Sequence, residues 1–424
     1  MKIALICKSD TKGGAAVVTF RLMEALRRIG VDARMIVAEK TSGSPWVIQA
    51  ISGHRSLIPF LSERLKIFVK NGFSRQTLFR IDTASDGLPL YRIPFVKEAD
   101  AICLNWVNQG MLSLQGLMKL NKLGKPIIWT MHDMWNMTGI CHHAGYCRHW
   151  LSPDGKCGYC PLLCNKGSLH DLSYKTWMRK KKVYDKTNIH FVAVSNWLAG
   201  CARRSSLMDN ADISVIPNAF PITDCPEATS GDRHDGKIRI IFGAARIDDP
   251  VKRHDILVAA TKAFNEKYPA LTGKIELVTF GGVKDPDALS GISIPHTDLG
   301  VIAPSRIRDI YETGDIVVST SEWETLPGTL IEGQAWGCVP VAFDHGGQSD
   351  IIDHLQTGYL ARWSDNNNPE IAMRNNAEAI ADGIAWAAET CRNTGIKERM
   401  RESVCARFSE DAVAKRYLDL IHNL

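Results

Sequence analysis

Two glutamates, Glu324 and Glu332, are the residues best suited to chemistry, and they lie eight positions apart within Ser321–Gly333. The Pro-Gly pair between them predicts a break in regular structure. The residues after that pair predict a helix whose first turn contains Glu332 and whose free N–H groups can hold an anion. The segment therefore offers carboxylates for sugar or ribose hydroxyls beside donors for a phosphate. The alternative is that one glutamate is simply exposed to solvent and the other caps the helix.

Two successive α/β series would position these residues. The first opens as strand, Gly-rich turn, helix and strand, with Gly13-Gly14 in the turn. These glycines do not match the dinucleotide-binding fingerprint, which argues against an NAD enzyme. A tight turn without a ligand is the alternative. Strands are expected at 2–8, 33–38, 101–106, 126–131, 190–195 and 213–217, then at 237–243, 274–280, 315–319 and 339–343. Helices are expected at 17–29, 254–267 and 412–422.

Further candidates lie at the ends of the expected strands. Arg246 ends one strand, and Lys252 and Arg253 stand just before the next helix. An arginine and a lysine so placed could clamp a diphosphate. In the first series His132-Asp133 follows a strand, where an aspartate can tune an imidazole or bind a hydroxyl. Ligands of doubly wound sheets bind at the carboxyl ends of strands, so we expect all of these residues at such edges.

The composition is that of an ordinary globular protein. The 424 residues are 45% hydrophobic and 23% charged, with a net charge of +5. This mild basicity favours anionic ligands or an anionic membrane surface without choosing between them. No secretory signal or membrane-spanning run is recognised, so we expect a cytoplasmic protein. Basic residues within 55–80 and 179–182 could touch lipid headgroups, with a solvated helix face as the alternative.

Five of the twelve cysteines fall between Cys141 and Cys164. Three interpretations stay open for this cluster: a structural zinc site, buried free thiols, or reversible disulfides. The zinc ligands would be Cys141, Cys147, Cys157 and Cys160, with Cys164 as a substitute. Because the cluster follows His132-Asp133 directly, it could shape the same part of the fold.

Taken together, these residues resemble the signature of retaining family-four glycosyltransferases. The resemblance includes Arg246…Lys252, the two glutamates, Gly333–Val341 and His345-Gly346-Gly347. It extends to Gly13-Gly14, Val194-Ser195, Ile216-Pro217-Asn218 and Phe408-Ser409…Tyr417. Residues Trp129–Pro161 further resemble the colanic-acid and exopolysaccharide subset.

The resemblance implies the GT-B architecture, two Rossmann-like doubly wound α/β domains with a cleft between them. We expect an acceptor-side domain at 1–217, with the cysteine-rich insertion at 141–164, and a linker at 218–236. A nucleotide-sugar-binding domain at 237–404 and a helix at 405–424 that returns to the first domain would follow.

It also implies a role for each residue. Arg246 and Lys252 would neutralise the donor diphosphate, Glu324 would face the sugar, and Glu332 would hold the ribose. Backbone N–H groups around Leu326, Pro327, Gly328 and Thr329, with Arg253, Gly13 and Gly14, would add diphosphate contacts. His132 would face the sugar and Asp133 would orient the acceptor. The fixed cations imply that no metal cofactor is needed for catalysis, leaving zinc only a structural place.

The expected partners are a UDP- or GDP-sugar donor, a glycan or lipid-linked acceptor, and transiently the inner membrane surface, but no nucleic acid. Two departures from the family pattern stand out. Both Glu322 and Glu324 are present, and the spacing to Glu332 selects Glu324. Trp106-Val107-Asn108 replaces a His-rich turn, which puts acceptor roles for Asn105 and Asn108 in doubt. A nucleotide-sugar epimerase, a phosphorylase and a non-catalytic binding module are the alternative functions.

Overall fold

The computed structural model describes residues 1–151, 153, 155–222 and 236–424. Its chain divides into two compact units, Met1–Ala219 with Val413–Leu424, and Phe220–Ala412. Each unit is described by itself. Residues 223–235 of the expected linker lie outside the described residues. Among those described, none of the helices has the length and apolar character that crossing a membrane requires.

The first unit is built on a seven-stranded parallel sheet in the order β3-β2-β1-β4-β5-β6-β7. Its strands are β1 Lys2–Ser9, β2 Asp32–Glu39, β3 Val47–Gln49, β4 Ala101–Leu104, β5 Ile127–Met131, β6 Ile189–Ala193 and β7 Asp212–Val215. The central strands are continuous apolar runs because helices cover both faces of a parallel sheet. β1, β4 and β5 are neighbours, so the residues that follow them meet at one edge.

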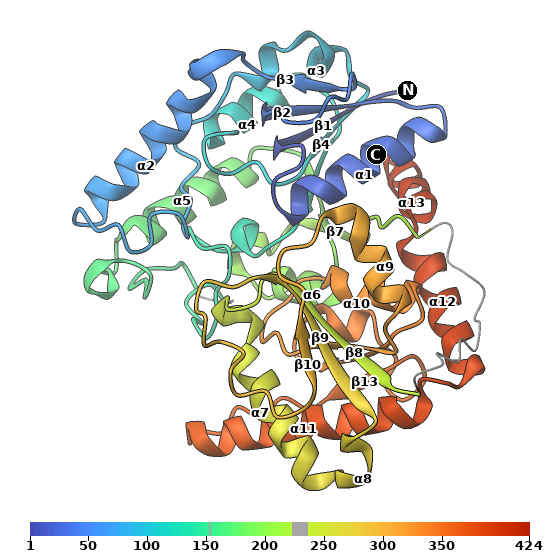
Figure 1. Cartoon of the computed structure of the whole chain (residues 1–424). Helices are drawn as coiled ribbons and strands as arrows, with labels where there is room; N and C mark the ends of the chain where they lie inside the picture. Colours follow the sequence, from blue (N-terminus) through green and yellow to red (C-terminus); the bar gives the residue numbers. More distant parts are fainter. Residues whose placement is uncertain (152, 154, 223–235) are drawn as a thin grey trace. The chain divides into compact units, whose positions relative to one another are not determined.

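Helices α1 Gly14–Arg28 and α13 Glu410–His422 cover one face of this sheet. Val413, Ala414, Tyr417 and Ile421 of α13 belong to the same buried cluster as α1 and the central strands. The expectation that the C-terminal helix returns to the first domain is therefore confirmed (Figure 1). The other helices of this unit are α2 Ile58–Lys70, α3 Pro94–Glu98, α4 Leu114–Asn121, α5 Leu172–Tyr184 and α6 Asn196–Arg203.

The second unit contains a six-stranded parallel sheet in the order β10-β9-β8-β11-β12-β13. Its strands are β8 Ile238–Arg246, β9 Ile275–Gly282, β10 His296–Asp298, β11 Ile316–Ser319, β12 Val339–Phe343 and β13 Tyr359–Ala361. Its helices are α7 His254–Lys267, α8 Pro269–Thr272, α9 Ile307–Glu312, α10 Gly328–Ala335, α11 Pro369–Thr390 and α12 Thr394–Phe408. The fold class expected from the sequence, two Rossmann-like α/β domains, is confirmed.

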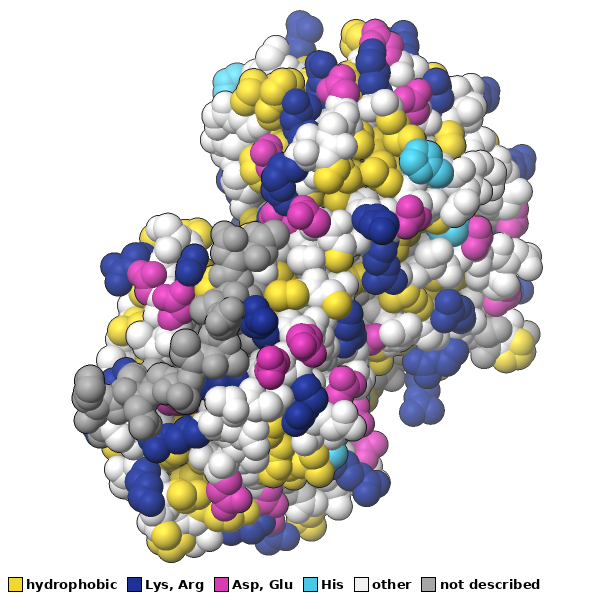
Figure 2. Space-filling view, turned by 90° about the vertical axis from the view of Figure 1, so that its right-hand side faces the viewer, with side chains coloured by type: hydrophobic (Ala, Val, Ile, Leu, Met, Phe, Trp, Pro, Cys, Tyr) yellow, Lys and Arg dark blue, Asp and Glu magenta, His cyan; other side chains and the backbone are white. Residues whose placement is uncertain are grey.

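The main core of the second unit lies between this sheet and helices α7, α11 and α12. Helix α10 packs closely on β11, since a Cβ on Gly333 would lie only 2.6 Å from Val317. On the face drawn in Figure 2, acidic and basic side chains are interspersed, and neither sign dominates. The packing of these helices on the sheet supports the loops at the carboxyl ends of the strands.

Candidate functional site

The second sheet brings the expected donor-site residues to one edge. Because β8, β11 and β12 are adjacent and parallel, their carboxyl ends lie side by side. Arg246 ends β8, Glu324 lies in the loop after β11, and His345 follows β12. This is the edge at which doubly wound sheets bind ligands.

Lys252 and Glu324 form the closest ion pair at this edge. Lys252 Nζ lies 2.5 Å from Glu324 Oε1, and both side chains are partly exposed, by 30% and 19%. Lys252 ends a 3-10 turn, Pro250–Lys252, in which the N–H of Val251 donates to the side chain of Asp249 at 3.2 Å. The lysine is therefore held by a hydrogen-bonded turn.

Two further contacts hold the loops that carry this pair. Thr320 Oγ1 donates to the carbonyl oxygens of Lys252 and Arg253, at 2.9 and 3.0 Å. The N–H of Glu322 donates to the carbonyl of Val251 at 3.0 Å. The loop after β11 and the loop after β8 therefore form one hydrogen-bonded unit.

The neighbouring arginines have carboxylate partners of their own. Arg246 Nη2 lies 3.0 Å from Asp249, and its Nε lies 3.5 Å from Asp248. Arg253 sits in the left-handed region at φ 49° and binds Asp255 through Nε and Nη2, at 3.0 and 2.9 Å.

Glu322 and Glu324 face different cations. Glu322 lies 3.5 Å from Arg253 Nη1, whereas Glu324 is bound to Lys252. The two adjacent candidates therefore differ in their surroundings, a distinction that the sequence spacing alone could only suggest.

Gly346 and Gly347, in the loop after β12, pack against the backbone of the segment that carries Glu324. The N–H of Gly347 donates to the carbonyl of Glu324 at 2.8 Å. A Cβ on Gly347 would overlap the carbonyl oxygen of Thr325, and Gly346 has φ 133°, a conformation that favours glycine. Hence this close approach of two backbone segments requires both glycines.

Helix α10 begins one residue earlier than the sequence predicted. Pro327 is its N-cap residue and Gly328 its first residue, so Thr329 is the second. The expectation that Glu332 lies in the first turn is therefore wrong; it lies in the second turn and is half-buried. Its charge, after burial, contributes to raising the pKa of the Tyr311 hydroxyl well above the usual value.

Three aromatic side chains at this edge were not among the predicted site residues. The ring of His345 stacks on Trp363 with centroids 5.2 Å apart, and it lies 4.5 Å from the ring of Trp323. Burial lowers the pKa of His345, which favours the neutral imidazole. The His345-Gly346-Gly347 motif pointed to this loop, but nothing in the sequence pattern pairs it with Trp363.

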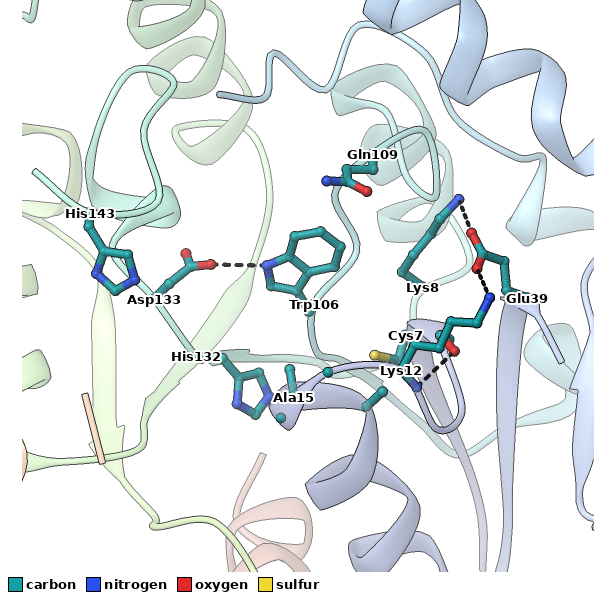
Figure 3. A pocket seen from close by; sticks show the side chains of 14 residues that line it. Cys7, Lys8, Lys12, Ala15, Glu39, Trp106, Gln109, His132, Asp133 and His143 are labelled. Atoms are coloured by element: carbon teal, nitrogen blue, oxygen red, sulfur yellow. Dashed lines mark hydrogen bonds and ion pairs between the residues drawn. The ribbon is translucent and has the colours of Figure 1, made fainter. Parts of the chain in front are cut away.

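The first unit has its own pocket at the carboxyl edge of its sheet, with a volume of about 550 Å³ (Figure 3). Apart from the candidate zinc ligands, it contains all four residues that the sequence assigned to this unit: Gly13, Gly14, His132 and Asp133. It also contains residues that were not assigned: Cys7, Lys8, Ser9, Lys12, Ala15, Ala16, Glu39, Trp106, Gln109 and His143. These residues end or follow β1, β2, β4 and β5, or open α1, which is why distant sequence positions meet here.

The Gly-rich turn contributes cations and helix N–H groups to the pocket. Gly13, at φ 90°, is the N-cap residue of α1, and the first turn of α1 contains no acidic side chain. Lys8 and Lys12 share the carboxylate of Glu39, at 3.5 and 3.2 Å (Figure 3). The two lysines and the helix dipole make this side of the pocket favourable to anions.

His132 is a neutral imidazole in this pocket. Burial lowers its pKa to about 4, although the charge of Asp133 acts in the opposite direction. Its Nε2 lies 3.1 Å from Oδ1 of Asn105, so the amide fixes the ring. Asn105 thus has a defined contact despite the departure from the family pattern around Trp106.

Asp133 is held by three donors. Trp106 Nε1 lies 3.0 Å and His142 Nδ1 2.7 Å from its Oδ2, and the N–H of Trp135 donates to Oδ1 at 2.8 Å. Burial alone would raise the pKa of Asp133, but the charge and hydrogen bond of His142 reverse this and hold the pKa well below its usual value. Asp133 is therefore an ionised carboxylate.

His142, from the cysteine-rich insertion, is clamped between two carboxylates. Its second nitrogen, Nε2, lies 2.6 Å from Oδ2 of the fully buried Asp82. Burial lowers the pKa of His142, but Asp133 and Asp82 raise it to about 10. Asp82 is also paired with Arg64 of α2. A buried network thus runs from the pocket through the insertion to α2. No sequence signal pointed to Asp82, and Arg64, counted among the basic residues of 55–80 that could touch lipid, is instead 5% exposed.

The four cysteines proposed as zinc ligands lie in one neighbourhood, because the charges of Cys141 and Cys147 act on both Cys157 and Cys160. Among the described residues, which omit 152 and 154 of this segment, no group of three or more His, Cys, Asp or Glu side chains could hold a metal ion. Cys157 Sγ instead accepts the N–H of Gly139 at 3.2 Å, and burial raises the pKa values of Cys157 and Cys160 to about 12. The expected structural zinc therefore stays a prediction.

Comparison with known proteins decides the family. The model of "Glycosyltransferase Family 4" matches residues 12–223, half of the chain, and that of "Glycosyl transferases group 1" matches residues 238–390. The chain belongs to glycosyltransferase family 4.

Curated relatives of this family-4 chain are distant. It is 23% identical over 350 residues to "Putative colanic acid biosynthesis glycosyl transferase WcaC" of Escherichia coli K12, covering 79% of this chain and 80% of the relative. It is 29% identical over 216 residues to D-inositol 3-phosphate glycosyltransferase of Actinosynnema mirum, covering 43% of this chain and 50% of the relative. The chain thus matches about half the length of that relative.

Solved glycosyltransferase structures share the fold of this family-4 chain. Sucrose-phosphate synthase of Thermosynechococcus elongatus superposes with a TM-score of 0.63 at 17% identity, covering 100% of this chain and 98% of the other. HepE of Anabaena in complex with UDP and glucose gives 0.59 at 14% identity, with both chains fully covered. At these identities the likeness establishes the GT-B type of fold and nothing finer.

Proposed function

We propose that this protein transfers a sugar from a nucleotide-diphosphate donor, a UDP- or GDP-sugar, to a hydroxyl of a glycan or lipid-linked oligosaccharide in exopolysaccharide assembly. The observation that carries the proposal is the Lys252–Glu324 pair at the carboxyl edge of the second sheet, with Arg246 at the end of the adjoining strand. Family membership and the UDP complexes of HepE support a nucleotide-sugar donor.

The donor would bind to the second unit. Arg246, Lys252 and the free N–H groups at the start of α10 would stabilise the diphosphate, and Glu332 would hold the ribose. Glu324 would face the transferred sugar. Fixed positive charge is most effective where negative charge develops, which here is the bridging oxygen of the departing diphosphate.

The proposed reaction retains the anomeric configuration. The acceptor oxygen bonds to the anomeric carbon on the face from which the diphosphate departs, while the bond from that carbon to the phosphate oxygen breaks. The acceptor proton passes to the released phosphate oxygen, so atoms and charge balance. Glu324 would stabilise the positive charge that develops on the sugar ring.

The acceptor would use the pocket of the first unit. Asp133 is an oriented anion that can accept a hydrogen bond from a hydroxyl, and neutral His132 can face a sugar hydroxyl without adding charge. Lys8 and Lys12 suit an acceptor that carries a phosphate, as a lipid-linked oligosaccharide does. Such an acceptor implies a cytoplasmic protein in peripheral contact with the membrane.

Thermal unfolding in the presence of individual nucleotides and nucleotide sugars tests the donor class. A bound donor raises the unfolding temperature by mass action. We expect UDP, GDP or one of their sugars to do so, and the proton NMR spectrum of the product to show the donor's anomeric configuration. Inversion would overturn the retaining mechanism, and stabilisation by none of the nucleotides would overturn the donor assignment.

A further inference from the structure

Helix α2, Ile58–Lys70, has two charged residues in the interior beside Ile67, while several of its large apolar residues are exposed. Glu63 and Arg64 are 0% and 5% exposed, whereas Leu61 and Leu65 are 59% and 62% exposed. Amphipathic helices of globular proteins show the opposite arrangement, because burial of apolar surface stabilises the fold. The exposed apolar side of this helix destabilises the isolated protein, and a binding partner outside the described residues would explain it.

The exposed surface extends beyond the helix itself. We define the α2 face by its seven large apolar side chains, each 39% to 67% exposed: Leu57, Ile58, Leu61, Leu65, Val69, Phe73 and Phe79. Figure 1 shows α2 at the periphery of its unit. Single exposed apolar residues are ordinary, but a contiguous group of this size marks an interaction surface.

The buried side of α2 prevents the helix from turning its apolar side inward. Glu63 accepts hydrogen bonds from the N–H and Oγ1 of Thr83, at 3.0 and 3.1 Å. Arg64 donates to the carbonyl of Ile81 at 3.0 Å and pairs with Asp82. Rolling the helix would take Arg64 away from the fully buried Asp82, and loss of one partner of a buried ion pair is strongly destabilising.

The edge of the α2 face is basic. Arg55, Lys70, Arg75 and Arg80 are exposed, and none of the four has an ion-pair partner in the part of the chain that the structure describes. Lys66, by contrast, is bound to Asp86 at 2.7 Å. Apolar side chains surrounded by unpaired cations complement a surface that is apolar inside and anionic at its boundary.

We propose that the α2 face docks on an anionic phospholipid membrane. The apolar side chains enter the boundary between headgroups and acyl chains, and the four cations lie at the headgroup phosphates. A protein partner would not require unpaired cations beside the apolar surface, and a symmetric dimer through this face would bring like charges near one another.

The α2 face is also connected to the pocket of the first unit. Phe60 of α2 has its ring 5.3 Å from Nζ of Lys8, which lines the pocket. The backbone of Phe60 lies so close to Gly110 that a Cβ there would overlap it. Docking through α2 would therefore bring this pocket to the membrane; the benefit for a lipid-linked acceptor rests on the proposed function, whereas the docking does not.

Flotation of the full-length protein with phospholipid vesicles, without donor or acceptor, tests the proposal. We expect binding to vesicles rich in phosphatidylglycerol and weak binding to vesicles of phosphatidylcholine. The double variant Leu61→Gln/Leu65→Gln should lose at least tenfold in vesicle affinity, because two buried side chains are removed from the membrane. Arg75→Glu/Arg80→Glu should also bind less, and 1 M NaCl should weaken the wild type.

The matched control is Val301→Gln, which removes an 81% exposed apolar side chain from the second unit. It should bind vesicles as the wild type does. The proposal is overturned if the wild type does not bind anionic vesicles, or if Leu61→Gln/Leu65→Gln binds them as well as Val301→Gln. It is also overturned if the wild type is a dimer and Leu61→Gln/Leu65→Gln is a monomer that binds vesicles as the wild type does. Nucleotide-induced thermal stabilisation, measured on the same samples, reports on the proposed function separately.

Discussion

Nζ of Lys252 and Oε1 of Glu324 lie 2.5 Å apart, so the cation assigned to the donor diphosphate is bound to the carboxylate assigned to the sugar. A diphosphate would compete with Glu324 for this lysine. Donor binding then releases the glutamate from its ion pair and leaves it available for the sugar. The pair thus connects the two halves of the proposed donor site.

Removal of either partner should abolish transfer without unfolding the protein. We expect Lys252→Ala and Glu324→Ala each to lower the transfer rate by on the order of 10²–10³-fold. The free energy of unfolding should change by no more than about 1 kcal/mol, because the pair is partly exposed. The two variants should differ in one respect: Lys252→Ala loses the thermal stabilisation by UDP or GDP, whereas Glu324→Ala keeps it.

Arg306→Ala is the control for this pair, because it removes an exposed cation bound to Asp309 in the same unit. It should retain normal transfer and nucleotide binding. Near-normal turnover of Lys252→Ala or Glu324→Ala would show that the donor site has been assigned to the wrong residues.

His142 should make the stability of the protein pH-dependent on the alkaline side. Its pKa is raised from 6.5 to about 10 by Asp133 and Asp82 against the effect of burial. The charged imidazole therefore stabilises the folded state fully below about pH 6.5, and this contribution is lost as the pH rises toward 10. We expect His142→Gln to lower the thermal midpoint at pH 6 and to flatten its decline between pH 6 and 10.

His54→Gln changes an exposed histidine of the same unit and should leave this profile unaltered. If the thermal midpoint of His142→Gln declines with pH as steeply as that of the wild type, His142 is not the group held in its charged form by the two carboxylates.

The contact between the Gly346-Gly347 loop and the loop that carries Glu324 should be intolerant of a single added methyl group. Gly347→Ala places a Cβ on the carbonyl oxygen of Thr325, and the loop that carries Glu324 must move. We expect a loss of about 1–3 kcal/mol in unfolding free energy and at least tenfold lower transfer. Gly273→Ala is the control, because its Cβ would meet no atom within 4 Å. Equal behaviour of both variants in urea unfolding would contradict the packing argument.

The cysteine cluster should contain thiols rather than metal. Among the described residues no group of three or more ligating side chains could hold a metal ion, and burial raises the pKa of the Cys157 and Cys160 thiols to about 12, so without a metal they are protonated at neutral pH. Elemental analysis of protein purified without added zinc should find substoichiometric metal, and chelators should not lower the thermal midpoint. One equivalent of zinc that Cys157→Ser loses and Cys405→Ser retains would establish the zinc site instead.

Local patterns predicted the central strands of both sheets but not the short edge strands β3, β10 and β13. Strand β12 and helix α7 occupy the predicted residues, since apolar runs and caps are local signals. Contacts such as Asp82 with His142 join residues sixty positions apart, and no local pattern encodes them. The interior orientation of Glu63 and Arg64 was missed for a related reason: the periodicity of α2 marks an apolar side but does not say which side faces the core.

Helix α13 has a consequence for the order in which the chain can fold during synthesis. Tyr417 bonds through its hydroxyl to Thr130 at 2.8 Å, and its neighbours complete the core around α1. These residues leave the ribosome only after the whole of Phe220–Ala412. Although domains usually fold in the order of their synthesis, the first unit must wait for the second with part of one face of its sheet uncovered. A nascent chain stalled before Val413 should therefore be a substrate for chaperones.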